Sequence, residues 1–399
     1  MKVLEKKVMI EHKPERAPIC GFATYISATE PVLLRRCGWE VGDDVHDDFY
    51  DLISRDNGQT WEAPIPSLRS TAVVGGFMVF VENSAIFLEK RNRLVTITDL
   101  KFEPSLEGAH GEYSAQLHIT VRDPNDATEA QPFVSDFGIR QGLYVSFCHP
   151  VEDSRGRLLV PVMWQKVDDG SIQQRGFPTR PDLPDVLMDV WEVALLIGEF
   201  DANGEIVWNV GNAVPCEFGK SSRGMNEGTV AELQDGRLAM VLRGSNVGWP
   251  DKPGYKWLSF SSDGGTNWTE PIPLPCDDGS TPESSATGSA LFRSIKNGRL
   301  YWIGNLCLHG ERASGNFPRS PLVIAEVQEE PFALRRDSIT IIDERAPHED
   351  AGVQMSNFRF YQDRLTGDTV LYLTRYGERG SHQLDWMMAD NYQYRVSVE

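Results

Sequence analysis

One layout occurs twice in this chain: Ser54-Arg-Asp56-Asn-Gly58-Gln-Thr-Trp61 and Ser261-Ser-Asp263-Gly-Gly265-Thr-Asn-Trp268. In the pattern Ser-x-Asp-x-Gly-x-x-Trp, the Ser and Asp side chains bond the backbone of a tight turn, and glycine supplies a positive φ angle. The tryptophan that ends each copy is placed to anchor the turn to a neighbouring sheet. The repeated layout therefore predicts hairpins of one kind at two distant points of the chain.

Short apolar or alternating segments recur along the chain, each bounded by turn residues, and their length favours strands over helices. They span residues 158–164, 193–197, 229–233, 238–242, 300–303, 322–325 and 369–374. Hairpin signals lie between or beside them at Asn203-Gly204, Asp235-Gly236, Asn297-Gly298 and Thr366-Gly367-Asp368. Residues 201–208 read as a decayed third copy of the repeated layout. Consecutive hairpins at short spacing predict antiparallel sheets.

The repeated layout resembles the Asp-box, or BNR repeat, of sialidases, whose fold is a six-bladed β-propeller with four-stranded antiparallel blades. This resemblance implies an all-β chain with a single domain over residues 1–399. Six blades would take roughly 65 residues each, more than the ~40–45 of a compact repeat, so some loops must be long. In that family the Asp-boxes lie away from the active site, which implies a structural role for Asp56 and Asp263.

Composition excludes several classes of partner. The formal net charge is −19, whereas phosphate binding needs concentrated Lys and Arg, so we expect neither nucleic acid nor an anionic membrane as a partner. A local arginine cluster remains compatible with a small anionic substrate. The oligomeric state is left open by the sequence.

The cysteines are widely spaced, with no C-x-x-C pair and no Cys/His grouping at zinc spacing, so we expect ordinary buried thiols, no metal and no cofactor. The first 12 residues hold no apolar run long enough for a signal peptide, and no later run approaches the ~20 residues of a membrane span. We therefore expect a cytoplasmic protein, although a secreted chain that had been trimmed would look the same.

The strongest candidate for chemistry is the segment from Asn226-Glu227 through Asp235-Gly236 to Arg243. The two ends of a hairpin lie beside each other, so Glu227 and Arg243 are expected to meet. The segment resembles one in sialidases in which the Glu polarises a nucleophile and the Arg belongs to a triad that grips the substrate carboxylate. Arg319, directly before the strand at 322–325, resembles the third arginine of that triad. The alternatives are a solvated Glu227, a surface Arg243 and a structural ion pair at Arg319.

Acid candidates precede the first Asp-box, where sialidases place their general acid. Counted back from Ser54, Asp48 resembles a supporting aspartate, and Asp43 or Asp44 resembles the acid itself. Clustered carboxylates raise one another's pKa toward the range that a general acid needs, although an acidic run is more often a solvated loop.

Two features of the family pattern are missing. The usual Phe/Tyr-Arg-Ile-Pro motif near the N-terminus corresponds to Tyr25-Ile-Ser-Ala-Thr-Glu-Pro31, which has no arginine unless Arg35 or Arg36 replaces it. The nucleophilic tyrosine of the last blade is absent from Gln354-Met-Ser-Asn-Phe358. These departures disfavour ordinary hydrolysis of a terminal sialic acid and favour a pocket retained for another sugar.

Other polar residues near predicted strand ends could supply replacement chemistry. His149 stands before Pro150 and is a candidate base near neutral pH, with a structural hydrogen-bonding role as the alternative. The remaining candidates are Tyr255, Lys256, His309, Arg375 and Tyr376.

Three functions follow from these residues. The leading one is a glycoside hydrolase, similar to an exo-sialidase, that cleaves a terminal and acidic sugar with Glu227 and one of the acid candidates as its carboxylate pair. The second is a lyase on a uronic-acid glycan, in which His149 or a tyrosine abstracts a proton. The third is a glycan-binding propeller without turnover.

Overall fold

A computed structural model describes residues 1–42, 45–69, 71–73, 76–103, 116–124, 133–134, 149–165, 190–217, 219–380 and 383–398. The chain divides into two compact units, Met1–Val145 with Ser294–Gly298 and Ala346–Glu399, and Ser146–Arg293 with Arg299–Arg345. Antiparallel strands build both units, while α2 (Gln383–Trp386) forms a single helical turn. Within the described ranges no helix is long and apolar enough to span a membrane. The expectation of a single domain stays a prediction.

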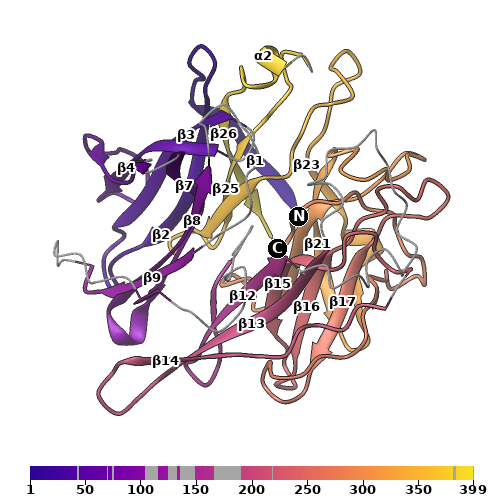
Figure 1. The fold of residues 1–399 in the computed structure, drawn as a ribbon, viewed down its shortest axis with the longest axis horizontal. Coiled ribbons are helices and arrows are strands. Elements are labelled where there is room, and N and C mark those ends of the chain that lie inside the picture. The colour runs from indigo at the N-terminus through magenta and orange to yellow at the C-terminus, as the bar shows by residue number, and fades with distance from the viewer. Residues whose placement is uncertain are drawn as a thin grey trace. The chain divides into compact units, whose positions relative to one another are not determined.

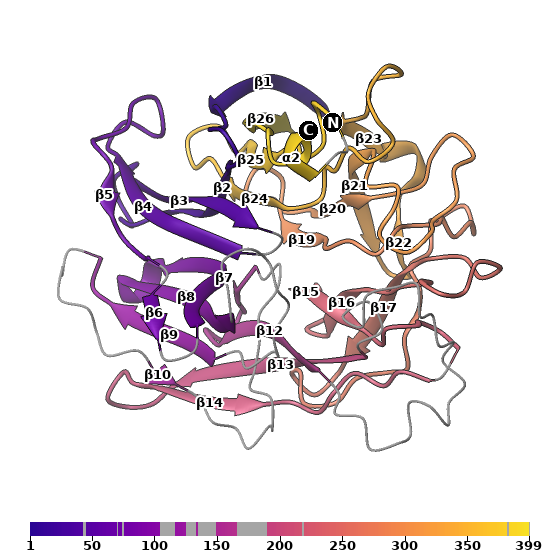
Figure 2. The same cartoon turned by 45° about the horizontal axis from the view of Figure 1, so that its top comes forward.

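In the first unit, the two ends of the chain share one sheet. Its strands follow the order β1 (Lys2–Ile10), β26 (Asn391–Ser397), β25 (Thr369–Thr374) and β24 (Phe358–Gln362). Strand β1 pairs antiparallel with β26, and Figure 2 shows the two side by side. The N-terminal strand therefore completes a sheet whose other strands come from the C-terminal end of the chain.

The rest of the first unit consists of two successive groups of strands. The first group is β2 (Ala17–Tyr25), β3 (Leu33–Gly42), β4 (Val45–Ser54) and β5 (Ile65–Pro66). The second is β6 (Thr71–Val73), β7 (Gly76–Leu88), β8 (Arg93–Glu103), β9 (Gln116–Arg122) and β10 (Phe133–Val134). One backbone pairing, His46 with Phe80, joins β4 to β7, so the two groups form a continuous path of strands.

In the described part of the second unit, three sheets have their strands in chain order. They are β11 (Val151–Glu152), β12 (Leu158–Gln165), β13 (Trp191–Phe200) and β14 (Ile206–Val210); β15 (Asn226–Glu232), β16 (Leu238–Arg243), β17 (Lys256–Ser261) and β18 (Ile272–Pro273); and β19 (Ala290–Arg293), β20 (Leu300–Asn305), β21 (Leu322–Glu329) and β22 (Phe332–Leu334), with β23 (Thr340–Asp343) paired to β21. Figure 1 shows β15, β16 and β17 next to one another in one of these sheets. All seven predicted strand segments coincide with or overlap observed strands.

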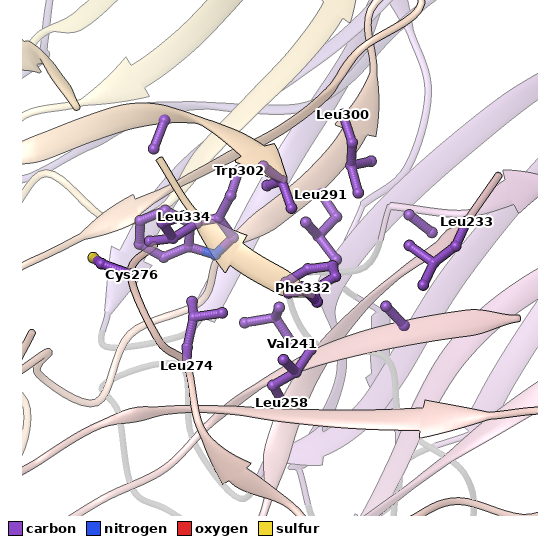
Figure 3. Close-up of a cluster of buried hydrophobic side chains, with 14 of the residues drawn as sticks. Leu233, Val241, Leu258, Leu274, Cys276, Leu291, Leu300, Trp302, Phe332 and Leu334 are labelled. Carbon is purple, nitrogen blue, oxygen red and sulfur yellow. The ribbon is translucent and has the colours of Figure 1, made fainter. Parts of the chain in front are cut away.

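A buried apolar cluster lies between the last two sheets of the second unit (Figure 3). Val241 and Leu258 come from β16 and β17, and they pack with Leu291 of β19 and Trp302 of β20. All four side chains are almost fully excluded from water. Each such burial contributes about 1.5–3 kcal/mol relative to an exposed side chain, so the cluster holds these two sheets in a fixed packing.

The two repeated turns have matching hydrogen bonds. Asp263 accepts from the backbone N–H of Asn267 at 2.9 Å, and Asp56 accepts from that of Thr60 at 2.8 Å. In each turn the leading serine also donates to the aspartate and accepts from the glycine four residues on. Hydrogen bonding within the turns lowers the pKa of both carboxyls to about 2. The carboxylates thus serve their own turns, as the turn chemistry predicts.

Candidate functional site

A row of polar residues crosses one end of the sheet β15–β18 in the second unit. Asn226 pairs with Arg243, and Arg243 pairs in turn with Lys256, so three adjacent strands present these residues at the same level. Glu227 follows Asn226 at a register shift and has a φ of 43°, in the left-handed region that is rare for residues other than glycine. This irregular strand start turns Glu227 toward its neighbours. Asp263 follows the other end of β17, away from this row.

Glu227 and Arg243 form an ion pair, as the hairpin argument predicts. The Nη1 of Arg243 donates to the Glu227 carboxylate, and its Nη2 donates to Asn316 Oδ1 at 3.1 Å. Each of the two charged side chains is 12% exposed. The Nε of Arg243 is buried and has no hydrogen-bond partner. The pair is therefore largely desolvated while retaining an edge toward solvent.

Lys256 lies beneath this pair and is 2% exposed. Its Nζ donates to the Ser285 carbonyl at 2.9 Å and to Thr287 Oγ1 at 3.0 Å. Burial and, after it, the charge of Arg243 lower the pKa of Lys256 from its ordinary value near 10.5 to about 7, and the charge of Glu227 opposes this shift. An ammonium group held here adds positive charge that Glu227 alone does not balance.

Arg319 joins the same cluster. Its Nε donates to the Asn316 carbonyl at 3.2 Å, so Asn316 contacts both Arg319 and Arg243. The charge of Arg319 also contributes to the lowered pKa of Lys256. Glu227 is thus paired with Arg243, and Asn316 links Arg243 to Arg319, so the two guanidinium groups outnumber the one carboxylate in this part of a strongly acidic chain. We call Glu227, Arg243, Lys256 and Arg319 the charged cluster.

The other candidates of the second unit have different surroundings. His149 is partly buried and comes shortly before β11. Tyr255 contacts Trp257 edge to face, with 6.2 Å between ring centroids. His309 is exposed, and its Nε2 lies 3.8 Å from the Glu344 carboxylate.

In the first unit, Asp48 lies between two arginines. Its carboxylate oxygens are 3.3 Å from Nη1 of Arg16 and 3.1 Å from Nε of Arg69. The side chain is 39% exposed, and its φ is 49°. Asp43 and Asp44 lie outside the described residues. The structure therefore describes one of the three acid candidates, and that one is paired with cations.

Arg36 and Arg375, both predicted to bind substrate, are engaged in buried ion pairs. Arg36 holds Asp51 through two hydrogen bonds of 2.8 and 2.9 Å, across the pairing of β3 with β4. Arg375 holds Glu349 in the same two-point manner at 2.7 and 2.9 Å. A guanidinium group that donates two hydrogen bonds to one carboxylate has few N–H donors left to bind a substrate. The geometry favours a structural role for both.

Two groups in the first unit, the partners of the sequence candidate Tyr376 and the residue Arg16, were missed by sequence reasoning. The hydroxyl of Tyr376 donates to the buried Glu40 carboxylate, which lies 3.8 Å from Nε2 of His46. The ring of Trp386 stacks on Tyr376 with centroids 4.4 Å apart. No sequence pattern links residues 40 and 376, because they belong to different sheets.

Arg16 is the second group. It stands directly before β2, contacts Asp48, and is followed two residues later by Pro18. Arg16-Ala-Pro18 therefore keeps the arginine and proline spacing of the Arg-Ile-Pro motif without its aromatic residue. That spacing is the signal that would have identified it. At the place expected for a tyrosine, Met355 is fully buried.

A metal site is not indicated in the part of the chain that the structure describes, since no group of three or more His, Cys, Asp or Glu side chains gathers there. No family model and no curated protein sequence matches the chain.

Solved structures are similar along its whole length. A protein of unknown function from Dyadobacter fermentans has a TM-score of 0.64 at 13% identity, covering 100% of this chain and 99% of that one. The intramolecular trans-sialidase from Ruminococcus gnavus, in complex with oseltamivir carboxylate, has a TM-score of 0.62 at 11% identity, covering 98% and 97%. The K499G mutant of the NanB sialidase from Streptococcus pneumoniae has a TM-score of 0.61 at 12% identity, covering 98% of this chain and 70% of that one.

These similarities confirm the predicted fold. The chain is a six-bladed β-propeller of the sialidase type, with four-stranded antiparallel sheets as its blades. The low identity marks it as divergent within that fold.

Proposed function

We propose that this protein is a glycoside hydrolase, similar to a sialidase, that acts on a terminal sugar carrying a carboxylate. The charged cluster is the observation that carries the proposal. Glu227 pairs with Arg243 at the end of one sheet, Lys256 is buried beside them, and Asn316 links Arg243 to Arg319; Arg243 and Glu227 retain an edge toward solvent. A sugar carboxylate fits such a site because guanidinium groups bind carboxylates through paired, charge-assisted hydrogen bonds.

The residues of the cluster would divide the work. Arg243 and Arg319 bind the carboxylate of the sugar, and Lys256 adds positive charge beside them, without touching the substrate, at pH values where it is protonated. Glu227, released from part of its contact with Arg243 when the substrate carboxylate arrives, polarises the nucleophile. The candidates for the acid that protonates the leaving group stay those of the sequence, Asp43, Asp44 and Asp48, which belong to the first unit. The fold is compatible with a sugar substrate, because the similar R. gnavus structure is an intramolecular trans-sialidase in complex with oseltamivir carboxylate.

Turnover of a substrate panel tests the proposal. The panel contains sialosides, aryl glycosides of neutral and acidic sugars, and uronic-acid oligosaccharides, with reducing ends and ultraviolet absorbance read together. We expect new reducing ends from an acidic glycoside without new ultraviolet absorbance, since only elimination creates an unsaturated product. The Glu227→Gln variant should lose this turnover, and Glu205→Gln, in an exposed turn of the same unit, should keep it.

Two outcomes would replace the proposal. An ultraviolet-absorbing product from a uronic acid would assign a lyase. Glycan binding that persists in wild type and Glu227→Gln, with no turnover at any pH, would assign a binding propeller.

A further inference from the structure

Two cysteines face each other across the first strand pair of the first unit. Cys20 on β2 is the direct register partner of Cys37 on β3. Both are free thiols, and the Cys20 thiol donates to the Phe22 carbonyl at 3.5 Å. Sequence reasoning treated all the cysteines as ordinary buried residues, because residues 20 and 37 are adjacent only through the pairing of these strands.

The type of pairing suits a covalent bond. Antiparallel partners alternate between hydrogen-bonded and non-hydrogen-bonded positions, and side chains lie closer at the latter. Pro18, which has no N–H, pairs with Trp39 two residues before Cys20, and this indicates a non-hydrogen-bonded position there. Two residues along, Cys20 and Cys37 occupy the same type of position. The Cα separation of about 4.5 Å typical of such pairs lies within the range that a disulfide spans.

The surroundings favour reaction at Cys37. Arg35, two residues earlier on β3, is 3% exposed, and its Nε and Nη1 have no hydrogen-bond partner. The neighbouring Cys20 side chain and the charge of Arg35 lower the pKa of Cys37 against the opposing effect of burial. Cys37 is fully buried, whereas Cys20 is partly exposed, so a small oxidant reaches the pair from the side of Cys20. A thiolate next to a guanidinium and beside a second thiol is the arrangement of an oxidation-sensitive pair.

We propose that Cys20 and Cys37 are a redox modification site that closes into a reversible disulfide between β2 and β3 when the protein meets a peroxide.

The chemistry balances with hydrogen peroxide as the oxidant. The Cys37 thiolate attacks one peroxide oxygen, the O–O bond breaks, and the departing hydroxide takes up a proton to give water and a sulfenic acid on Cys37. The Cys20 sulfur then attacks the Cys37 sulfur, the S–S bond forms, and the S–O bond breaks. The second hydroxide leaves with the Cys20 proton as water. Two thiols are oxidised to one disulfide, and one peroxide is reduced to two waters.

Peptide mapping of the whole protein tests the proposal. After peroxide treatment and removal of excess peroxide with catalase, free thiols are blocked with N-ethylmaleimide and the protein is digested with trypsin without reductant. Cleavage after Arg16, Arg35, Arg36 and Arg55 places the two cysteines in separate peptides, 17–35 and 37–55. We expect these peptides to appear linked, lighter by two hydrogens than their sum, and to separate when dithiothreitol is added.

Variants supply the controls. Cys37→Ser should abolish the linked species, while Cys216→Ser, in the second unit, should leave its yield unchanged. If peptides 17–35 and 37–55 both remain fully alkylated, or if Cys37 gains two or three oxygens without linkage, the proposal is overturned. The wild-type map decides this even if Cys37→Ser fails to fold.

Discussion

Replacing the buried Lys256 with methionine should remove a specific pH dependence from the stability of the protein. In the folded state Lys256 has a pKa of about 7, whereas in the unfolded chain it returns to its ordinary value near 10.5. Between these values the unfolded state binds more protons than the folded state, so the free energy of unfolding rises with pH. Below pH 7 the lysine is charged in both states, so the whole free-energy cost of burying its charge is subtracted from the free energy of unfolding. Above pH 10.5 the lysine is neutral in both states, and the folded state no longer carries the cost of a buried charge.

The size of the effect follows from the two pKa values. Between pH 7 and pH 9 the contribution of Lys256 to the free energy of unfolding should rise by about 2 kcal/mol. Methionine removes the hydrogen bonds that Lys256 donates to the Ser285 carbonyl and to Thr287 Oγ1, which costs about 1–3 kcal/mol at every pH. That loss cancels when the pH dependence of the two proteins is compared. Cys307, whose pKa is raised to about 12, does not titrate in this range.

Guanidinium chloride unfolding at pH 7, 8 and 9 measures the difference. The gap between wild type and Lys256→Met should widen in favour of wild type by about 2 kcal/mol from pH 7 to pH 9. Equal pH dependence in the two proteins would show that Lys256 keeps its ordinary pKa. The charged cluster would then lack the desolvation that we assign to it.

Three further predictions concern stability. Arg36→Met leaves Asp51 without its partner and should cost about 3 kcal/mol, whereas Arg55→Met, whose side chain is 68% exposed, should cost less than about 1 kcal/mol in the same denaturant assay. Asp263→Asn should lower Tm above pH 4, and this difference should shrink as the pH falls toward about 2, where the folded Asp263 is protonated; a constant difference would refute the role of the charge. Gly224→Ala puts a Cβ 2.1 Å from the Trp191 carbonyl oxygen and should lower Tm far more than Gly236→Ala, which meets no atom within 4 Å; similar losses would contradict the packing at Gly224.

The sequence predicts what local chemistry determines. The repeated turns and the strand segments were identified because each depends on a few consecutive residues. The contact between Glu227 and Arg243 is predictable because a single hairpin connects the two residues. Lys256 joins them only through the next strand and its register, so its burial had no local signal.

Contacts between residues of distant strands escaped prediction for the same reason. Cys20 and Cys37 are opposite each other because of a register that shifts directly after Cys20. Tyr376 and Glu40 meet from separate sheets. Arg36 was proposed to bind substrate since nothing in its sequence surroundings reveals that Asp51 holds it from the neighbouring strand.

The most direct test of the central claim is whether the charged cluster recognises a carboxylate. We would measure kcat/KM for the acidic glycoside identified in the panel and for its methyl ester, using wild type, Arg243→Met and the control Arg237→Met, whose residue lies at the other end of the same hairpin. Loss of a charge-assisted hydrogen bond costs about 1.5–3 kcal/mol, so wild type and Arg237→Met should prefer the acid by about 10- to 100-fold. Arg243→Met should lose most of that preference. Equal rates with acid and ester in the wild type, or a preference that survives in Arg243→Met, would contradict the claim.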